Sequence, residues 1–229
     1  MADAVPVICL DGPSGSGKGT IATRLAARLG WHLLDSGALY RLVAYAARAG
    51  DVDFGDEAAL AACAADLDLV FEPAAELEAV RILLDGRDVS SAIRSDAVGQ
   101  DASVVAAVAA VRDALVQRQR AFRRPPGLVA DGRDMGTVVF TDAPLKIYLT
   151  ASVEARAERR YKQLMAKGLP ASLRDLFESL RERDARDMNR AVAPLRPADD
   201  AITVDSTEMD VDAVFDAVLA HARAHGLAS

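Results

Sequence analysis

The residues best suited to chemistry form one glycine-rich stretch near the N-terminus, Gly12-Pro13-Ser14-Gly15-Ser16-Gly17-Lys18-Gly19-Thr20. Glycines let such a loop wrap with its backbone N–H groups pointing inward, where they can bind phosphate oxygens. Lys18 adds a mobile positive charge suited to the β- and γ-phosphates of a nucleoside triphosphate. Gly19 stands where Ser or Thr is usual and the hydroxyl follows at Thr20, so we expect no direct bond from a hydroxyl beside the lysine to Mg²⁺.

A second block follows a short predicted strand and reads Leu34-Asp35-Ser36-Gly37-Ala38-Leu39-Tyr40-Arg41. Ser36 lies at a helix N-terminus, where it can cap the helix and also meet a phosphate. Arg41 lies on the next turn, where its guanidinium can bind the same phosphate through two hydrogen bonds. Taken alone, the block would be better explained as an ordinary capped helix with an exposed arginine, but beside the glycine-rich loop we favour phosphate binding.

A third block, Asp131-Gly132-Arg133-Asp134-Met135-Gly136, comes directly after a buried strand. Ligands of open α/β sheets bind at the carboxyl ends of the strands. Asp131 is placed either to hold a magnesium-bound water or to orient an arginine. The block would otherwise be a turn with a local ion pair.

Two charged helices near the C-terminus carry further arginines. Arg183, Asp187 and Arg190 fall on one helix face, which could grip a sugar and a phosphate or could be a solvated, salt-bridged surface. Arg156, Arg159 and Arg160 share a face of the preceding helix, ahead of a loop at 168–170. A mobile segment that bears arginines can close over a transferring phosphoryl group.

The elements that must position these residues alternate between strand and helix. Short apolar runs predict strands at 5–10, 32–34, 69–71, 80–84, 128–130, 145–149 and 201–204. Helical patterns cover 20–29, 36–48, 57–67, 104–122, 153–166, 173–189 and 211–224. This alternation predicts an α/β fold built on a parallel sheet, and the two hairpin-like strands predict an insert at about 68–96.

Composition limits the remaining possibilities. The chain has 229 residues, enough for one compact domain, and its net charge of -7 disfavours a nucleic-acid-binding surface. We find no apolar run of the ~20 residues that a membrane helix needs and no export signal, so we expect a cytoplasmic protein. The two cysteines, Cys9 and Cys63, are expected to be reduced, and the three histidines show no metal-binding or triad spacing.

Together the blocks resemble bacterial-type cytidylate kinases, a family of nucleoside monophosphate kinases. The string Asp-Gly-Arg-Asp-Met-Gly-Thr-Val-Val-Phe at 131–140 and the string Arg-Ala-Val-Ala-Pro at 190–194 carry the resemblance most specifically. It extends over nearly the whole chain. It implies a single kinase domain over 1–229, with a parallel sheet flanked by helices, a small β-containing insert at about 68–96 on the monophosphate side and a short lid at about 156–172.

The resemblance also implies a role for individual residues. The monophosphate would be held by Ser36, Arg41, Arg133 and Arg190. The sugar would meet Arg183 and Asp187, and the base would be read by Ser103, Arg112 and Asp134. Asp131 would lie in the substrate site, and the groups that assist transfer would be Lys18, Arg133, Arg159 and Arg160.

The implied reaction is phosphoryl transfer from ATP to CMP or dCMP. Mg²⁺ would be bound mainly through the nucleotide phosphates and water, with no metal ligand set in the protein. The partners would be these small molecules alone, with no nucleic acid or membrane, and we expect a monomer.

Two alternatives stay open from the residues alone. The same fold could serve UMP, AMP or a small alcohol, in which case Asp35 could act as the base that an alcohol acceptor needs. The loop could also belong to a nucleotide-dependent switch, although the Asn-Lys-x-Asp string expected of a GTPase does not occur.

Overall fold

The computed structural model describes residues 5–72 and 81–229. The chain divides into two compact units. The first is formed by the residues up to Asp35 together with Gln119–Ser229, and the second is Ser36–Arg118. Each unit is described separately below.

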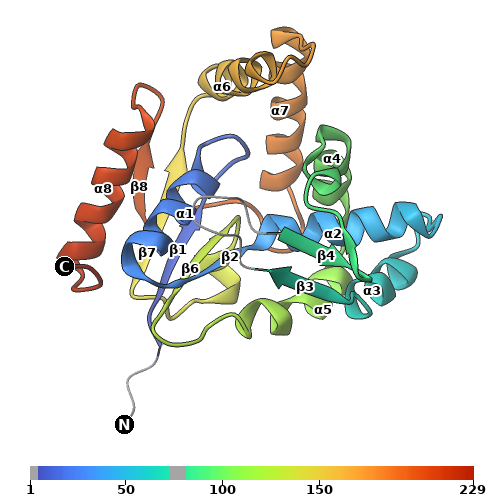
Figure 1. Cartoon of the computed structure of the whole chain (residues 1–229), viewed down its shortest axis with the longest axis horizontal. Helices are drawn as coiled ribbons and strands as arrows, with labels where there is room; N and C mark the ends of the chain where they lie inside the picture. The colour runs from blue at the N-terminus through green and yellow to red at the C-terminus, as the bar shows by residue number, and fades with distance from the viewer. Residues whose placement is uncertain (1–4, 73–80) are drawn as a thin grey trace. The chain divides into compact units, whose positions relative to one another are not determined.

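The first unit is built on a five-stranded parallel sheet with the order β2-β6-β1-β7-β8 (Figure 1). Its strands are β1 (Val7–Asp11), β2 (His32–Asp35), β6 (Leu128–Gly132), β7 (Leu145–Thr150) and β8 (Ile202–Asp205). All five residues of β1 are buried, as expected for the central strand of a sheet covered on both faces. The predicted parallel sheet is therefore confirmed.

The register of the strands brings the chemistry-bearing blocks to one edge of the sheet. Asp11 pairs with Gly132 across β1 and β6, and Asp35 pairs with Asp131 across β2 and β6. Because the strands are parallel, the loops that follow them leave the sheet on the same side. The glycine-rich loop after β1 and the block after β6 are thus neighbours.

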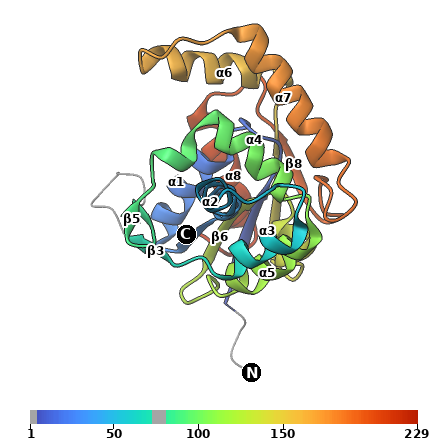
Figure 2. The same ribbon diagram turned by 90° about the vertical axis from the view of Figure 1, so that its right-hand side faces the viewer.

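The helices of this unit are α1 (Lys18–Leu29), α6 (Val153–Ala166), α7 (Leu173–Met188) and α8 (Val211–Ala224). Helices α1 and α8 pack against each other and bury a core with β1, in which Leu10, Leu25 and Val218 are fully buried. Helices α6 and α7 pack together and extend beyond the carboxyl ends of the strands, as Figures 1 and 2 show. The predicted lid, 156–172, covers most of α6 and the turn between these two helices.

One element of this unit was not predicted. Met135–Val139 forms a single π-helical turn, η2, inside the third block. Its hydrogen bonds include Val139 N–H to Asp134 O at 3.2 Å and Phe140 N–H to Met135 O at 2.7 Å, both five residues apart. Such turns are rare and occur frequently at functional sites.

The second unit is mainly helical and contains a small antiparallel sheet. Its helices are α2 (Ser36–Ala49), α3 (Glu57–Ala65), the 3₁₀ turn η1 (Ala92–Arg94), α4 (Asp96–Val105) and α5 (Ala109–Arg120), the last of which ends in the first unit's range. The strands are β3 (Leu69–Glu72), β4 (Arg81–Leu84) and β5 (Arg87–Asp88). The two antiparallel strands predicted for the insert are present as β3 and β4, and residues 73–80 lie outside the described residues.

The single helix expected over 104–122 was wrong. The chain forms α4, breaks over 106–108 and resumes as α5. Helix α4 begins at Asp96 because Ser95 caps it, accepting a hydrogen bond from Val98 N–H at 3.3 Å. Sequence reasoning missed this helix, although its buried residues Val98, Ala102 and Val105 recur at helical spacing.

No helix in the described part of the chain combines the length and the apolar character needed to cross a bilayer.

Candidate active site

The glycine-rich loop is fixed by a close approach to β7. Gly12 has φ +148°, and a β-carbon there would lie 2.0 Å from the Leu149 carbonyl oxygen, so no other residue fits. Gly17, with φ +94°, then leads into α1, which begins at Lys18. The helix N-terminus and its positive dipole end therefore face the interior of the loop, as in a phosphate-binding site.

Lys18 is buried within this loop. Its Nζ donates to the Pro13 carbonyl oxygen at 2.8 Å and to Ser16 Oγ at 3.5 Å. Burial, followed by the nearby positive charge of Arg133, lowers the pKa of Lys18 to about 7. The lysine is thus held by the loop's own oxygens and would exchange them for phosphate oxygens when a nucleotide binds.

Asp131 is the carboxylate that faces Lys18 from β6. Burial raises the pKa of Asp131 to about 6, although the charge of Lys18 works in the opposite direction. A β-carbon at Gly19 would lie 3.3 Å from Asp131 Oδ2. The absence of a side chain at position 19 therefore gives this carboxylate room beside the loop, which is a physical reason for the departure from the usual Ser or Thr.

A carboxylate on α7 holds two of the predicted phosphate-binding arginines. Asp187 Oδ2 accepts from Arg133 Nε at 3.0 Å, and Asp187 Oδ1 accepts from Arg190 Nη2. Only 1% of the Asp187 side chain is exposed, and 4% of Arg190. Asp187 was expected to meet a sugar; in the structure its two carboxylate oxygens order Arg133 and Arg190.

Asp134 is buried at the start of η2, and its side chain makes no capping hydrogen bond to that helix. Asp11, from the end of β1, makes those bonds in its place. Asp11 Oδ1 accepts from Met135 N–H at 2.9 Å and Oδ2 accepts from Gly136 N–H at 2.8 Å. Burial raises the pKa of Asp11 to about 7.

The arginines of α6 have separate partners. Arg156 donates to the Ser14 carbonyl oxygen at 2.9 Å and forms a buried ion pair with Asp184 on α7. Arg159 donates to Ser206 Oγ at 3.1 Å and to the Met209 carbonyl oxygen at 3.2 Å. Arg160 is partly buried on the same helix. Arg156 and Arg159 therefore anchor α6 to the loop before α1 and to the loop after β8.

Arg183 lies on α7, one turn before Asp187, and is partly buried. Its charge helps to lower the pKa of Lys18, which shows that α7 carries positive charge close to the glycine-rich loop. The first unit thus brings Lys18, Asp131, Arg133 and Arg183 into electrostatic contact.

In the second unit, Arg41 of α2 lies against α4. Its Nη1 donates to the carbonyl oxygens of Ile93, at 2.7 Å, and Ser95, at 3.1 Å. A β-carbon at Gly99 would lie 2.8 Å from Arg41 Nη2. Gly99 therefore makes the space in which this guanidinium sits. Ser36 is buried at the first position of α2.

The two predicted base-reading residues of this unit lie around the junction of α4 and α5. Ser103 is buried on α4. Arg112 is buried on α5, where its Nη1 donates to the Ala106 carbonyl oxygen at 3.2 Å and its guanidinium carbon lies 5.6 Å from the centre of the Tyr40 ring. The ring and the carbonyl together restrict how this arginine can point.

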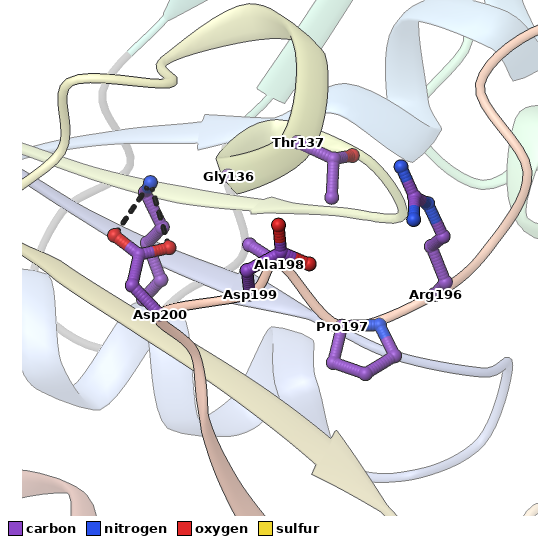
Figure 3. A pocket seen from close by; sticks show the side chains of 8 residues that line it. Gly136, Thr137, Arg196, Pro197, Ala198, Asp199 and Asp200 are labelled. Atoms are coloured by element: carbon purple, nitrogen blue, oxygen red, sulfur yellow. Dashed lines mark hydrogen bonds and ion pairs between the residues drawn. The ribbon is translucent and has the colours of Figure 1, made fainter.

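A pocket of about 180 Å³ lies beside η2 in the first unit (Figure 3). It is lined by Gly136, Thr137, Lys146, Arg196, Pro197, Ala198, Asp199 and Asp200. Lys146 Nζ donates to both carboxylate oxygens of Asp200, at 3.0 and 2.9 Å, and to the Thr141 carbonyl oxygen at 2.8 Å. None of the sequence-predicted site residues lines this pocket, so we do not assign it to the nucleotides.

Sequence reasoning did not single out Asp11 or Asp184, which hold site elements in place. Asp11 could have been noticed as a carboxylate at the end of a buried strand, directly before the loop. Asp184 gave no separate signal within a run of charged residues. Among the described residues, no three His, Cys, Asp or Glu side chains gather as metal ligands.

Comparison with known proteins gives one consistent result. Residues 8–224 match the family model described as cytidylate kinase. The chain is 60% identical over 226 residues to the cytidylate kinases of Pseudomonas paraeruginosa PA7 and Pseudomonas aeruginosa UCBPP-PA14, covering 99% of this chain and 99% of each relative. It is also 60% identical over 228 residues to that of Pseudomonas savastanoi pv. phaseolicola 1448A, covering 100% of both chains. With this coverage and the glycine-rich loop, Asp131 and the Arg133–Asp187–Arg190 cluster in place, the chain belongs to the cytidylate kinase family.

Proposed function

We propose that this protein transfers the γ-phosphoryl group of ATP to CMP or dCMP, which yields ADP and CDP or dCDP. The observation that carries the proposal is the Arg133–Asp187–Arg190 cluster. One buried carboxylate orders two guanidinium groups, and Arg133 is close enough to Lys18 to lower its pKa. Such an array suits a second phosphate next to the triphosphate loop.

The acceptor in this reaction is a phosphate oxygen that is already ionised near neutral pH. No general base is needed, so catalysis reduces to positioning the two nucleotides and neutralising charge on the transferring group. The backbone N–H groups of the loop, Lys18 and Arg133 supply positive charge where it develops. Arg159 and Arg160 belong to the lid side of this arrangement.

Each substrate part has proposed partners. Ser36, Arg41, Arg133 and Arg190 would bind the monophosphate. Arg183 and Asp187 would meet the sugar, and Ser103, Arg112 and Asp134 the base. Rigid fixing of Arg41 by two carbonyl oxygens, and of Arg112 by one, supports these roles because a pre-ordered side chain loses little entropy on binding.

Mg²⁺ neutralises charge on the triphosphate in reactions of this class. Asp131 fits a water-mediated contact with such an ion: it is a carboxylate beside the loop, with no competing side chain at position 19. Its raised pKa of about 6 leaves it mostly ionised at neutral pH. We propose that Mg²⁺ is held chiefly by the nucleotide phosphates and water, and that the enzyme acts as a monomer in the cytoplasm.

Base selectivity tests the proposal most directly. Cytosine offers an amino donor at N4 and acceptors at N3 and O2, which suit the Asp134 carboxylate and the donors Arg112 and Ser103. Uracil reverses the polarity at O4 and N3, and each buried mismatch costs about 1–3 kcal/mol. We therefore expect kcat/KM for CMP to exceed that for UMP by about a hundredfold or more.

The experiment is an ADP-release assay with CMP, dCMP, UMP and AMP, using wild type and Asp134→Ala. Asp134→Ala should reduce kcat/KM for CMP much more than for UMP. Asp142→Asn, which removes a carboxylate paired with Arg123 at the surface, is the matched control and should behave as wild type. Equal losses on CMP and UMP would remove the base-reading role, and a wild type that prefers UMP or AMP would overturn the assignment.

A further inference from the structure

The N-terminus of η2 is capped by a residue from a different strand. Asp11, at the end of β1, accepts the N–H groups of Met135 and Gly136 with one carboxylate oxygen each. The register pairs Asp11 with Gly132, so this carboxylate lies beside the exit of β6. Only 5% of Asp11 is exposed, and both N–H groups belong to buried residues.

Local capping would ordinarily fall to Asp134. The residue before a helix, when it is Asp, Asn, Ser or Thr, accepts the N–H of the second or third helical residue, here Gly136 or Thr137, and Asp134 has both the position and the chemistry. Its side chain nevertheless makes no such bond. Because Asp11 already accepts hydrogen bonds from the start of η2, the Asp134 carboxylate does not turn back to cap its own helix.

Gly136 leaves room for the stem of Lys146 beside this contact. A β-carbon at Gly136 would lie 3.4 Å from Asp11 Oδ2 and 3.0 Å from Lys146 Cδ. The first turn of η2 is thus packed between a carboxylate on one side and a lysine stem on the other. Asp11 also directly precedes Gly12, so the residue that fixes η2 is continuous with the triphosphate loop.

We propose that Asp11 is a positioning residue for base selectivity, which caps η2 in place of Asp134 and so keeps the Asp134 carboxylate off the N–H groups of its own helix, for its proposed contact with the cytosine amino group. This inference rests on the proposed base-reading role of Asp134. Without Asp11, the N–H groups of Met135 and Gly136 would be left unsatisfied, and the Asp134 carboxylate would turn to accept that of Gly136.

A purely structural role makes a different prediction. If Asp11 served stability alone, its loss would reduce folding and lower kcat/KM for CMP and UMP by the same factor. If Asp11 is a positioning residue, its loss lowers the ratio of kcat/KM for CMP to kcat/KM for UMP. It should also raise KM for CMP while leaving KM for ATP within about twofold, because the triphosphate loop keeps its own glycines and Lys18.

The test compares Asp11→Asn, Asp134→Ala and the double variant at about pH 8, above the pKa of about 7 of Asp11. An amide retains one acceptor and places an N–H₂ donor against the other N–H of η2. The CMP/UMP ratio of kcat/KM should fall by about tenfold in Asp11→Asn. It should fall no further when Asp11→Asn is added to Asp134→Ala, because both changes act on one interaction. Asp142→Asn is the control for loss of a carboxylate.

Gly136→Ala is the second variant, for the case that Asp11→Asn does not fold. It leaves the buried carboxylate in place and presses a methyl group on the Lys146 stem beside the first turn of η2, so the ratio should fall in the same direction but less. An unchanged ratio in the folded variants, with equal losses on both substrates, would overturn the inference. An unchanged ratio in Asp134→Ala would instead refute the base-reading role on which it rests.

Discussion

Arg156 and Asp184 form a buried, two-pronged ion pair that joins α6 to α7. Arg156 Nη1 lies 3.1 Å from Asp184 Oδ1, and Nη2 lies 2.5 Å from Oδ2. The two side chains are only 3% and 10% exposed. The same guanidinium donates to the Ser14 carbonyl oxygen of the triphosphate loop. The pair therefore connects α6 and α7 to the loop through one residue.

Arg156→Ala should destabilise the protein by about 3–5 kcal/mol, because it leaves the Asp184 carboxylate buried without its partner. Arg156→Ala with Asp184→Ala should recover part of this loss, since the second change removes the uncompensated charge. Urea denaturation of the two single variants and the double variant measures both quantities.

Arg181→Ala is the matched control for this experiment. Arg181 is 66% exposed and lies 3.7 Å from Glu178, so its loss should change the stability by less than about 0.5 kcal/mol. A loss in Arg156→Ala as small as that in Arg181→Ala would show that the Arg156–Asp184 pair does not hold the two helices together.

Lys18 should take up protons when ATP binds. Its pKa is about 7 because it is buried and lies near Arg133, so about half of the lysines are neutral at pH 7. The triphosphate brings negative charge and raises that pKa. Calorimetry of ATP binding in two buffers of different ionisation enthalpy measures the uptake, which should fall by about half a proton in Lys18→Met.

Lys162→Met, which changes an exposed lysine on α6, should bind ATP with the uptake of wild type. Lys18→Met should also lose far more in kcat than in ATP affinity, because its charge is most effective in the transition state. A variant with near-normal turnover would contradict the assignment of Lys18 to the transfer.

Gly99→Ala should weaken CMP binding without weakening the fold. The new methyl group would lie 2.8 Å from Arg41 Nη2, so the guanidinium must move from the position that Ile93 and Ser95 give it. Moving the end of a flexible side chain is cheap in stability. We expect KM for CMP to rise about tenfold or more while the melting temperature shifts by at most a few degrees.

Gly55→Ala serves as the control for Gly99→Ala. Gly55 is exposed in the same unit, and the nearest atom to its added β-carbon would be 3.4 Å away, at ordinary contact distance. Its kinetics should match those of wild type. If Gly99→Ala also retained its KM for CMP, Arg41 would not bind the monophosphate.

Asp11 should make stability depend on pH. Burial raises its pKa from 3.8 to about 7 in the folded protein. Between these values the folded state keeps a proton that the unfolded chain has lost. The stabilising contribution is therefore full below about pH 4 and is lost as the pH rises towards 7. Asp131, with a pKa of about 6, acts in the same direction.

The measurement is the unfolding free energy of wild type and Asp11→Asn as a function of pH. From about pH 4.5 to 6.5, wild type should lose about 1 kcal/mol more per pH unit than the variant. Asp142→Asn is the control, since hydrogen bonding to Arg123 lowers the pKa of Asp142 and moves its titration below this range. Parallel curves for wild type and Asp11→Asn would mean that Asp11 titrates normally.

Much of the fold was accessible from the sequence, because local patterns determine it. The helices at 153–166 and 211–224 were predicted with the bounds that α6 and α8 have. Ser152 and Asp210 cap these helices by accepting hydrogen bonds from Ala155 N–H and Ala213 N–H. A capping side chain and an amphipathic stripe are visible in a single window of sequence.

The site elements that escaped prediction depend on partners far along the chain. Asp11 acts on Met135 and Gly136 across the sheet, and the spacing of residues cannot reveal a cap supplied by another strand. Arg156 and Arg159 share one helix face, but one binds Asp184 and the other Ser206. Only the tertiary structure distinguishes an arginine that fastens a helix from one that is able to meet a substrate.

The strand order has a consequence for how the protein is made. Strand β1 leaves the ribosome well before its neighbours β6 and β7, which begin only at Leu128 and Leu145. The apolar stretch Val7–Leu10 therefore has no strand to pair with until β6 and β7 have been synthesised. A nascent chain in this interval exposes a β-forming segment that chaperones can bind. The glycine-rich loop packs against β7 at Leu149, so we expect ATP to assist folding only after β7 has been synthesised.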